Sequence, residues 1–189
     1  MNGMRKLIVT ENITVDGVID AAEGWFGLAG AEGVDQSDQI EVLNAQMKAA
    51  DTFLCGRVTF EQMRSFWPNQ TDDETGVSDY LNRVAKFVVS STLTDPDLEN
   101  STVLSGPVLE QVQALKDQPG GDIVVTGSIQ LAQTLVRADL VDEYRLFVYP
   151  VVLGRGARLF ESATDVPGLT LVAAQPFRSG VVLLTYATS

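Results

Sequence analysis

The chain contains no histidine and only one cysteine, Cys55, among its 189 residues. Without histidine there is no Ser-His-Asp triad, no Cys-His pair and no histidine zinc site, so we expect no bound metal. A single cysteine excludes an internal disulfide and is typical of a reducing compartment, which makes the cytoplasm the expected location. We expect Cys55, in a buried strand, to serve packing. Acid–base chemistry must then come from Asp, Glu, Lys, Tyr or water, with a bound cofactor as a plausible carrier of the harder chemistry.

Basic residues are also scarce: 13 Lys and Arg stand against 25 Asp and Glu, and the formal net charge is −12. Nucleic acids and anionic membranes are bound by clustered Lys and Arg, so neither is an expected partner. No apolar run is long enough to span a bilayer. With 45% hydrophobic and 20% charged residues, the composition is that of an ordinary globular protein. We predict a single domain over residues 1–189 that binds a small molecule.

Apolar periodicity predicts an alternation of strands and helices. The predicted strands cover residues 6–15, 52–55, 86–90, 122–126, 143–152 and 181–188. The predicted helices cover residues 38–50, 59–67, 108–116 and 129–136, with a short helix before residue 86. We expect the last two strands to be joined through the turn at residues 153–156. This order predicts an α/β domain with a mostly parallel sheet and an antiparallel C-terminal edge.

Three predicted strand ends carry groups that suit a phosphate-bearing ligand, because such ligands collect at the carboxyl ends of strands and at helix N-termini. At the first, Gly56 allows close backbone approach and Arg57 can pair with a phosphate. Thr59 can donate a hydroxyl there, although with Gln62 it equally fits a helix-capping box. The other two are residues 126–129, where a glycine separates strand from helix, and residues 90–92, with three hydroxyls. Glycine, serine and threonine are also common in turns that bind nothing.

Trp25, Phe26 and Trp67 are the aromatic residues placed to form the wall of a pocket for a planar ring. The alternative is that they belong to the core, which is the commoner place for large aromatic side chains. The sequence therefore leaves both roles open for these three residues.

Six segments spread over nearly the whole chain carry a family resemblance. They are Val15-Asp16-Gly17-Val18-Ile19, the stretch from Gly56 to Pro68, Val88-Val89-Ser90-Ser91-Thr92, Thr126-Gly127-Ser128, Leu140-Val141-Asp142-Glu143-Tyr144, and Pro150 to Gly156. In these segments the chain resembles dihydrofolate-reductase-like proteins, and most closely the branch shared with the C-terminal reductase domain of the bifunctional riboflavin-biosynthesis deaminase/reductase. The resemblance implies a three-layer α/β/α fold, an NADPH-dependent oxidoreductase and a homodimer.

The resemblance also implies roles for matched residues. Those implied to bind the dinucleotide are Gly56, Arg57 and Thr59 at the phosphates, Ser90, Ser91 and Thr92 at the adenosine ribose, Thr126, Gly127, Ser128 and Ile129 at the diphosphate, and Asn12 and Ile19 at the nicotinamide carboxamide. A 2′-phosphate would bond to Ser91 or Thr92. Arg57 is the only cation among these implied dinucleotide-binding residues, so the expectation of NADPH over NADH depends on it.

On the substrate side, dihydrofolate reductases use a carboxylate of the first helix, and counting back from Gly56 places Ile40 at that position. The neighbouring Asp38 and Glu41 fit equally well as charges at a helix N-terminus, so folate is not the expected substrate. Asp16 is the candidate catalytic residue, with an ordinary Asp-Gly turn as the alternative.

Trp67, Leu153 and Gly154 are the candidate substrate-binding residues. The segment that contains the last two, residues 153–156, could instead form part of a dimer contact.

Three functions remain open from the sequence. The first is an NADPH-dependent reductase of a small conjugated heterocycle or carbonyl compound, with the proton delivered by Asp16 or water. The second is the riboflavin-pathway 5-amino-6-(5-phosphoribosylamino)uracil reductase, for which Arg64, Arg155 and Arg158 are the cations available to a substrate phosphate. The third is a nucleotide-binding scaffold without catalysis.

Overall fold

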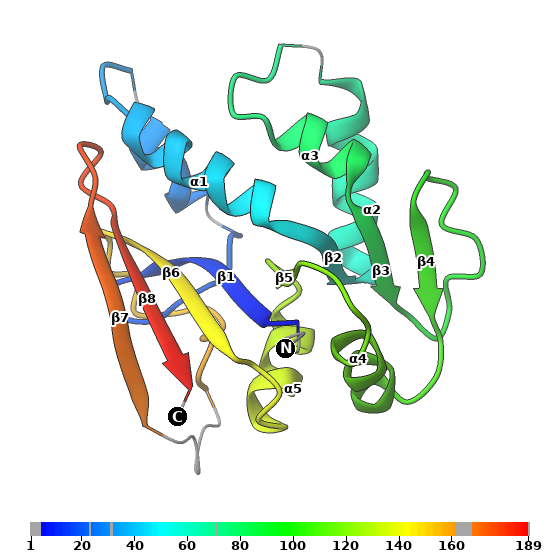
Figure 1. Ribbon diagram of the computed structural model, residues 1–189. Helices are drawn as coiled ribbons and strands as arrows, with labels where there is room; N and C mark the ends of the chain where they lie inside the picture. The colour runs from blue at the N-terminus through cyan, green and yellow to red at the C-terminus, as the bar shows by residue number, and fades with distance from the viewer. Residues whose placement is uncertain (1–4, 23, 31, 71, 162–167, 189) are drawn as a thin grey trace.

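The computed structural model describes residues 5–22, 24–70 without residue 31, 72–161 and 168–188. Within these residues, the chain forms one eight-stranded sheet with the order β4-β3-β2-β5-β1-β6-β8-β7 (Figure 1). The strands are β1 (Leu7–Thr14), β2 (Ala50–Gly56), β3 (Ala85–Val89), β4 (Ser101–Leu104), β5 (Asp122–Val125), β6 (Glu143–Tyr149), β7 (Leu169–Pro176) and β8 (Val182–Thr188). Strands β1 to β6 are parallel to their neighbours, whereas β8 is antiparallel to β6 and β7 is antiparallel to β8. The predicted parallel sheet with an antiparallel C-terminal edge is confirmed.

Helices cover both faces of this sheet. They are α1 (Ser37–Ala49), α2 (Arg57–Phe66), α3 (Val77–Arg83), α4 (Val108–Lys116) and α5 (Ile129–Arg137), with short 3₁₀ helices η1 (Trp25–Gly30) and η2 (Trp67–Asn69). Helices α4 and α5 pack in one hydrophobic cluster with one face of β1, β2 and β5, while α1, α2 and α3 pack in a second cluster on the opposite side (Figure 1). The result is the expected three-layer α/β/α arrangement.

The central strands lie in the core because both of their faces are covered. Leu7, Ile8 and Val9 of β1 are fully buried, as are Leu54 and Cys55 of β2. Strands covered on both faces are typically continuous apolar runs, which is why the sequence predicts these elements well. None of the helices in the described part of the chain is long and apolar enough to cross a membrane.

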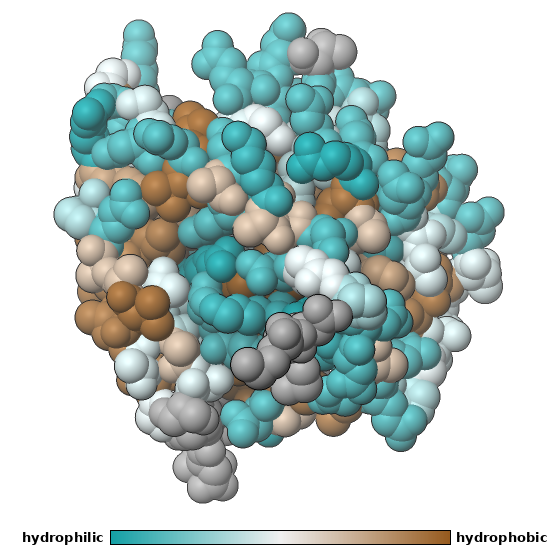
Figure 2. Space-filling model, viewed as in Figure 1, coloured by the Kyte–Doolittle hydropathy of each residue, from teal (hydrophilic) through white to brown (hydrophobic). Residues whose placement is uncertain are grey.

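The edges of the sheet depart from the prediction. Strands β4 and β7 were not predicted, and β7 lies between the turn after β6 and β8, so residues 153–156 do not join the last two strands directly. Nearly every residue of β7 is exposed, including Leu171 and Val172. Figure 2 shows apolar residues gathered on the side of the molecule where β7 lies in Figure 1.

Two helices begin one or two residues before their predicted starts. Helix α1 begins at Ser37, with Gln36 in the capping position, so Asp38 lies in its first turn as a charge at a helix N-terminus. Its carboxylate accepts a hydrogen bond from the backbone N–H of Arg178 at 3.1 Å. Helix α2 begins at Arg57, so Thr59 lies inside its first turn and is not a cap.

Candidate functional site

The sheet brings the three predicted phosphate-binding junctions side by side. Strands β3, β2 and β5 are neighbours, and their carboxyl ends lie at one edge of the sheet. Gly56 at the end of β2 is the register partner of Val89, the residue before Ser90. On the other side, Leu54 is paired with Val125, the residue before Thr126. The residues 56–59, 90–92 and 126–129 are therefore adjacent in space, although they are far apart in the sequence.

Two of these junctions are joined by a reciprocal pair of hydrogen bonds. The backbone N–H of Gly56 donates to Ser128 Oγ at 2.9 Å, and the backbone N–H of Ser128 donates to Thr59 Oγ1 at 3.0 Å. A Cβ atom on Gly127 would lie 3.4 Å from Thr59 Cγ2, so the backbone of one turn approaches the side chain of the other closely. These bonds hold the N-terminal ends of α2 and α5 next to each other.

The helix ends at these junctions are suited to a dinucleotide diphosphate. Neither α2 nor α5 has a side-chain cap, and the first N–H groups of a helix have no partner within the helix. Each N-terminus also carries the positive end of the helix dipole. Gly127 and Ser128 have φ angles of 61° and 52°, a left-handed conformation that is unfavourable for serine. Strain of this kind is concentrated at ligand-binding sites, and the residues present fit the cofactor that the resemblance implies.

At the third junction, Ser90 forms the turn and its neighbours face solvent. Ser90 Oγ accepts hydrogen bonds from the backbone N–H groups of Thr92 and Leu93 at 3.1 and 2.9 Å. Ser91 and Thr92 are exposed beside the end of β2. Ser90 thus has a structural role, whereas the exposed Ser91 and Thr92 are accessible to a ligand, and their contact with a 2′-phosphate stays a prediction.

Arg57 is exposed at the first turn of α2 and forms an ion pair with Glu61 at 3.0 Å. An exposed pair at this spacing contributes only about 0.3–0.5 kcal/mol. The guanidinium can therefore exchange Glu61 for a phosphate at little cost.

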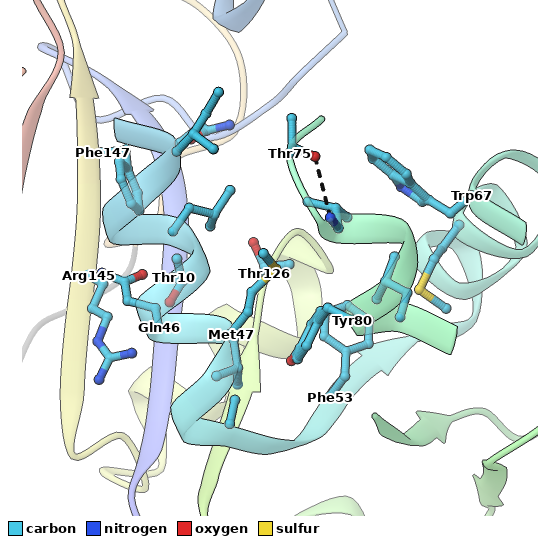
Figure 3. Close-up of a pocket in the computed structure, with 18 of the residues that line it drawn as sticks. Thr10, Gln46, Met47, Phe53, Trp67, Thr75, Tyr80, Thr126, Arg145 and Phe147 are labelled. Atoms are coloured by element: carbon cyan, nitrogen blue, oxygen red, sulfur yellow. Dashed lines mark hydrogen bonds between the residues drawn. The ribbon is translucent and has the colours of Figure 1, made fainter. Parts of the chain in front are cut away.

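A cavity of about 610 Å³ extends from these junctions along the face of the sheet that α1, α2 and α3 cover. Thr59 and Thr126 line it at the junctions, and apolar side chains such as Leu43, Met47 and Phe53 line its walls. Figure 3 shows Thr126, Met47 and Phe53 among the lining side chains. Ile40 also lines the cavity, at the position where the resemblance places a carboxylate. Among the described lining residues, Arg145 is the only charged side chain and there is no carboxylate.

Three side chains that line this cavity have buried polar atoms without a hydrogen-bond partner in the described structure: Thr10 Oγ1, Tyr80 Oη and Arg145 Nη1. Burial raises the pKa of Tyr80, so its hydroxyl remains protonated and can donate. The sequence alone does not identify these residues. Arg145 is a charged residue between apolar residues of β6, which is a signal of a functional role. Its neighbour on β1, Thr10, could not be known without the register of the two strands.

Arg145 belongs to an ion network at the start of β5 and β6. Its Nε donates to Glu143 Oε1 at 2.7 Å, and its Nη2 lies 3.5 Å from Asp122 Oδ2. Lys6 Nζ donates to the other oxygen of Glu143 at 2.9 Å. Burial opposes ionisation of Glu143, but the bonds from Lys6 and Arg145 lower its pKa overall. The charge of Arg145 is thus balanced by two carboxylates.

Asp16, the candidate catalytic residue, lies outside the lining of the cavity. The Thr14 hydroxyl donates to its Oδ1 at 2.6 Å, and the backbone N–H groups of Leu153 and Gly154 donate to its carboxylate at 3.2 and 2.7 Å. These bonds, led by that from Thr14, lower the pKa of Asp16 to about 2. Such a carboxylate is ionised at neutral pH and is a poor proton donor. Its geometry is that of an anchor for the loop after β6.

The remaining candidates are divided between the cavity and the core. Asn12 and Trp67 line the cavity, as their predicted roles require. Ile19 is buried in the main core. Trp25 packs edge-to-face against Tyr149 in a third cluster. Its Nε1 donates to the backbone oxygen of Asp20 at 2.7 Å, so it serves the core.

Leu153 and Gly154, bonded to Asp16, do not line the cavity, and Phe26 packs against the edge of Trp25. Cys55 is buried, and burial raises its pKa to about 12, so its thiol is unreactive in the folded chain. This fits the packing role expected for it. No group of His, Cys, Asp or Glu side chains within the described ranges is arranged to hold a metal ion.

Glu11, which the sequence analysis did not consider, lies in β1 beneath the turn at Gly127. It is only 4% exposed and accepts a hydrogen bond from the backbone N–H of Gly127, while its Oε1 has no partner in the described structure. Burial raises the pKa of the Glu11 carboxyl well above its ordinary value. A protonated, neutral Glu11 is compatible with an anionic ligand at the junction above it.

The sheet order, the two helical layers and the adjacent strand–helix junctions define an α/β protein with the dihydrofolate-reductase-like fold. The family model of the RibD C-terminal domain matches residues 5–183, and the chain belongs to this family. The family is reductase-like, which places the chain among proteins of oxidoreductase type.

Relatives of known sequence or structure cover almost the whole chain. It is 32% identical to the uncharacterized protein YyaP of Bacillus subtilis (strain 168) over 188 residues, 96% of this chain and 94% of YyaP. A solved structure from Shewanella sp. PV-4 is similar with a TM-score of 0.72 and 19% identity, covering 97% of this chain and 99% of that one.

The diaminohydroxyphosphoribosylaminopyrimidine deaminase/5-amino-6-(5-phosphoribosylamino)uracil reductase of Thermotoga maritima is similar with a TM-score of 0.66 and 13% identity. The likeness covers 98% of this chain and 57% of the Thermotoga chain. At these identities the two structural likenesses establish the fold alone.

Proposed function

We propose that the protein is an NADPH-dependent reductase that transfers a hydride to a small conjugated heterocyclic or carbonyl acceptor. The observation that carries this proposal is the bonded pair of junctions at Gly56–Thr59 and Thr126–Ser128, which opens directly onto the cavity. The membership of a reductase-like family supports it. In this arrangement the phosphates are held at one end of a cavity whose walls are mostly apolar.

The bound dinucleotide would supply a hydride from its nicotinamide C4 to an acceptor carbon. The π bond of the acceptor then opens, its electron pair moves to the adjacent oxygen or nitrogen, and that atom takes a proton from water or from a hydroxyl of the lining. The chain's part is to hold the phosphates with helix N–H groups and hydroxyls, and to exclude water with apolar walls. Asn12 belongs to the cavity lining and would bind the carboxamide.

Titration of NADPH and NADH, followed by fluorescence, tests the cofactor site. We expect saturable NADPH binding that weakens about tenfold in Arg57→Ala, because a charge-assisted contact to phosphate is lost. Arg137→Ala is the matched control, because it also removes one arginine charge, but from the last turn of α5, at the end of that helix away from the junction. If neither dinucleotide binds saturably to the wild-type chain, the reductase proposal fails. Tight binding without turnover of any acceptor would favour a non-catalytic nucleotide-binding scaffold.

The riboflavin-pathway uracil reductase is the second candidate, and the family relationship favours it. The substrate of such an enzyme carries a phosphate, which requires a cationic contact. Arg64 donates instead to the backbone oxygen of Pro96, and Arg158 lies 3.8 Å from Asp16; neither they nor Arg155 belong to the cavity lining described. Restored growth of a strain that lacks this reductase would support the second candidate, and failure to restore it despite good expression would count against it.

A further inference from the structure

The deep end of the cavity, between α1 and the middle of the sheet, contains donors that have no acceptor. Thr10 of β1 and Arg145 of β6 are register partners on adjacent strands, and both line the cavity. Figure 3 shows them together on one side, next to Gln46, with Tyr80 on the opposite side near Phe53. Thr10 Oγ1, Arg145 Nη1 and Tyr80 Oη are buried and lack a hydrogen-bond partner in the described structure.

An unsatisfied buried donor destabilises a fold, and a charged one does so more strongly. Of the five side-chain atoms of this kind in the described residues, three line this one cavity. Their concentration at one place is unlike a random packing defect, and it indicates that a ligand supplies the missing acceptors. The flexible side chain of Gln46 can turn aside to let a ligand atom reach them.

The electrostatics of this end specify an uncharged ligand group. Two nitrogens of the Arg145 guanidinium already face Glu143 and Asp122, so only Nη1 remains to donate. An additional anion would be repelled by these two carboxylates, and no second cation is present in the described lining to compensate. A neutral carbonyl oxygen has no such penalty and can accept from both Nη1 and the Thr10 hydroxyl.

We infer that Thr10 and Arg145 form a subsite for a ring carbonyl oxygen, and that the acceptor is an uncharged planar heterocycle without a phosphate. Its faces pack against apolar side chains such as Met47 and Phe53, while Tyr80 contacts a polar atom on its opposite edge. Arg145 is thus a specificity-determining residue of the pocket. This inference rests on the proposed function, because it names the substrate class of the same site.

Riboflavin and flavin mononucleotide are matched probes for this subsite, because they share one carbonyl-bearing ring system and differ by a phosphate. Their binding is followed by flavin fluorescence in the presence of saturating NADP⁺, which cannot donate a hydride. We expect riboflavin to bind at least about tenfold more tightly than flavin mononucleotide, since the phosphate finds no cation in the cavity. Equal binding, tighter binding of the phosphorylated probe, or no saturable binding of either would overturn the inference.

Two variants test the donors themselves. Arg145→Met should weaken riboflavin binding about tenfold, and Thr10→Val should weaken it several-fold while leaving the chain as stable or slightly more stable. That combination distinguishes a ligand-binding hydroxyl from a structural one. Lys6→Met is the matched control, because Lys6 shares Glu143 with Arg145 but lies outside the lining. If both pocket variants bind riboflavin as the wild type does, the subsite does not exist.

The same measurements separate this inference from the proposed function. If riboflavin binding responds to the variants but NADPH does not bind in the absence of NADP⁺, the reductase proposal fails and the subsite stands. If NADPH binds and Arg57→Ala weakens it, while the two probes bind alike, the reductase proposal stands and the subsite fails.

Discussion

The Asp16 cluster and the deep end of the cavity both place polar side chains beside β1, but their hydrogen bonds differ. Around Asp16, the carboxylate accepts from Thr14 and from two backbone N–H groups of the loop after β6. At the deep end, Thr10, Tyr80 and Arg145 each bury a polar atom that no described group satisfies. Glu11 is intermediate, with one bond to Gly127 and one oxygen without a partner.

This difference separates polar groups that hold the fold from those available to a ligand. A cluster whose polar groups all hydrogen-bond to one another gains nothing from a ligand, and the chain loses stability when one of these hydrogen bonds is removed. A hydroxyl without a partner, such as that of Thr10 or Tyr80, can be removed with little loss of stability, but the chain then binds its ligand less well. The sequence suggested Asp16 as the reactive group, whereas the polar atoms open to a ligand belong to Thr10, Tyr80 and Arg145.

The largest expected effect on stability is at Asp16. Asp16→Asn should lower the melting temperature by several degrees at neutral pH, because an amide replaces a carboxylate that accepts several hydrogen bonds. The folded pKa of about 2 is below the ordinary 3.8, so this stabilisation is present above pH 3.8 and is lost as the pH falls toward 2. Thermal unfolding of both chains across this pH range measures it.

Asp20→Asn is the matched control, because among the described residues the Asp20 carboxylate accepts one local bond, from the backbone N–H of Ala22. Its melting temperature should stay close to that of the wild type. If Asp16→Asn melts like the wild type but no longer turns over an acceptor, Asp16 belongs to the chemistry and the comparison drawn above is wrong.

The next effect concerns Glu11, whose pKa is raised, so that its contribution to stability changes with pH in the opposite direction to that of Asp16. The folded chain keeps the Glu11 proton while the unfolded chain releases it, so wild-type stability should fall as the pH rises above the ordinary carboxyl pKa of 4.5, until it reaches the folded pKa. Glu11→Gln should lack this slope and become more stable than the wild type near neutral pH. Urea unfolding at a series of pH values tests this.

Glu41→Gln, at an exposed position of α1, provides the control for Glu11 and should retain the wild-type slope. If the free energy of unfolding depends on pH in the same way in the wild type and in Glu11→Gln, the Glu11 carboxyl is ionised in the folded chain.

The smallest effect on stability is expected at Tyr80. Tyr80→Phe removes a hydroxyl without a partner, so the free energy of unfolding should remain within about 1 kcal/mol of the wild type. Riboflavin binding should weaken several-fold. Tyr149→Phe is the matched variant in the same lining: its hydroxyl bonds to Gln39, so this change should destabilise the chain by about 1 kcal/mol. The reverse order in denaturant unfolding would contradict the comparison.

The fold could be predicted where burial imposes a simple pattern. Strands β1, β2, β3 and β5 are rich in apolar or β-branched residues, and helices α4 and α5 repeat apolar residues at helical spacing. Strands β4 and β7 are edge strands with one neighbour each, and most of their side chains are not buried. Their pairing depends on the rest of the sheet, so little in their own residues indicates a strand.

The site could be predicted only at the level of its junctions. A glycine at a strand end indicated close backbone approach, and the sheet order brings these glycines together. The partner of Thr59 could not be inferred, because a capping box is a local pattern whereas Ser128 is 69 positions away. Arg145 was missed for a similar reason: its meaning depends on Thr10, Glu143 and Asp122, which only the register places around it.

The reciprocal bonds between Thr59, Gly56 and Ser128 also have a consequence for how the chain folds. Because they join residues 69 and 72 positions apart, they form only after β2 and β5 have paired, and closing so long a loop is entropically unfavourable. The nucleotide site is therefore absent from any partly folded chain in which these strands are separate. A dinucleotide that binds there selects the completed sheet and, by mass action, shifts the folding equilibrium toward it.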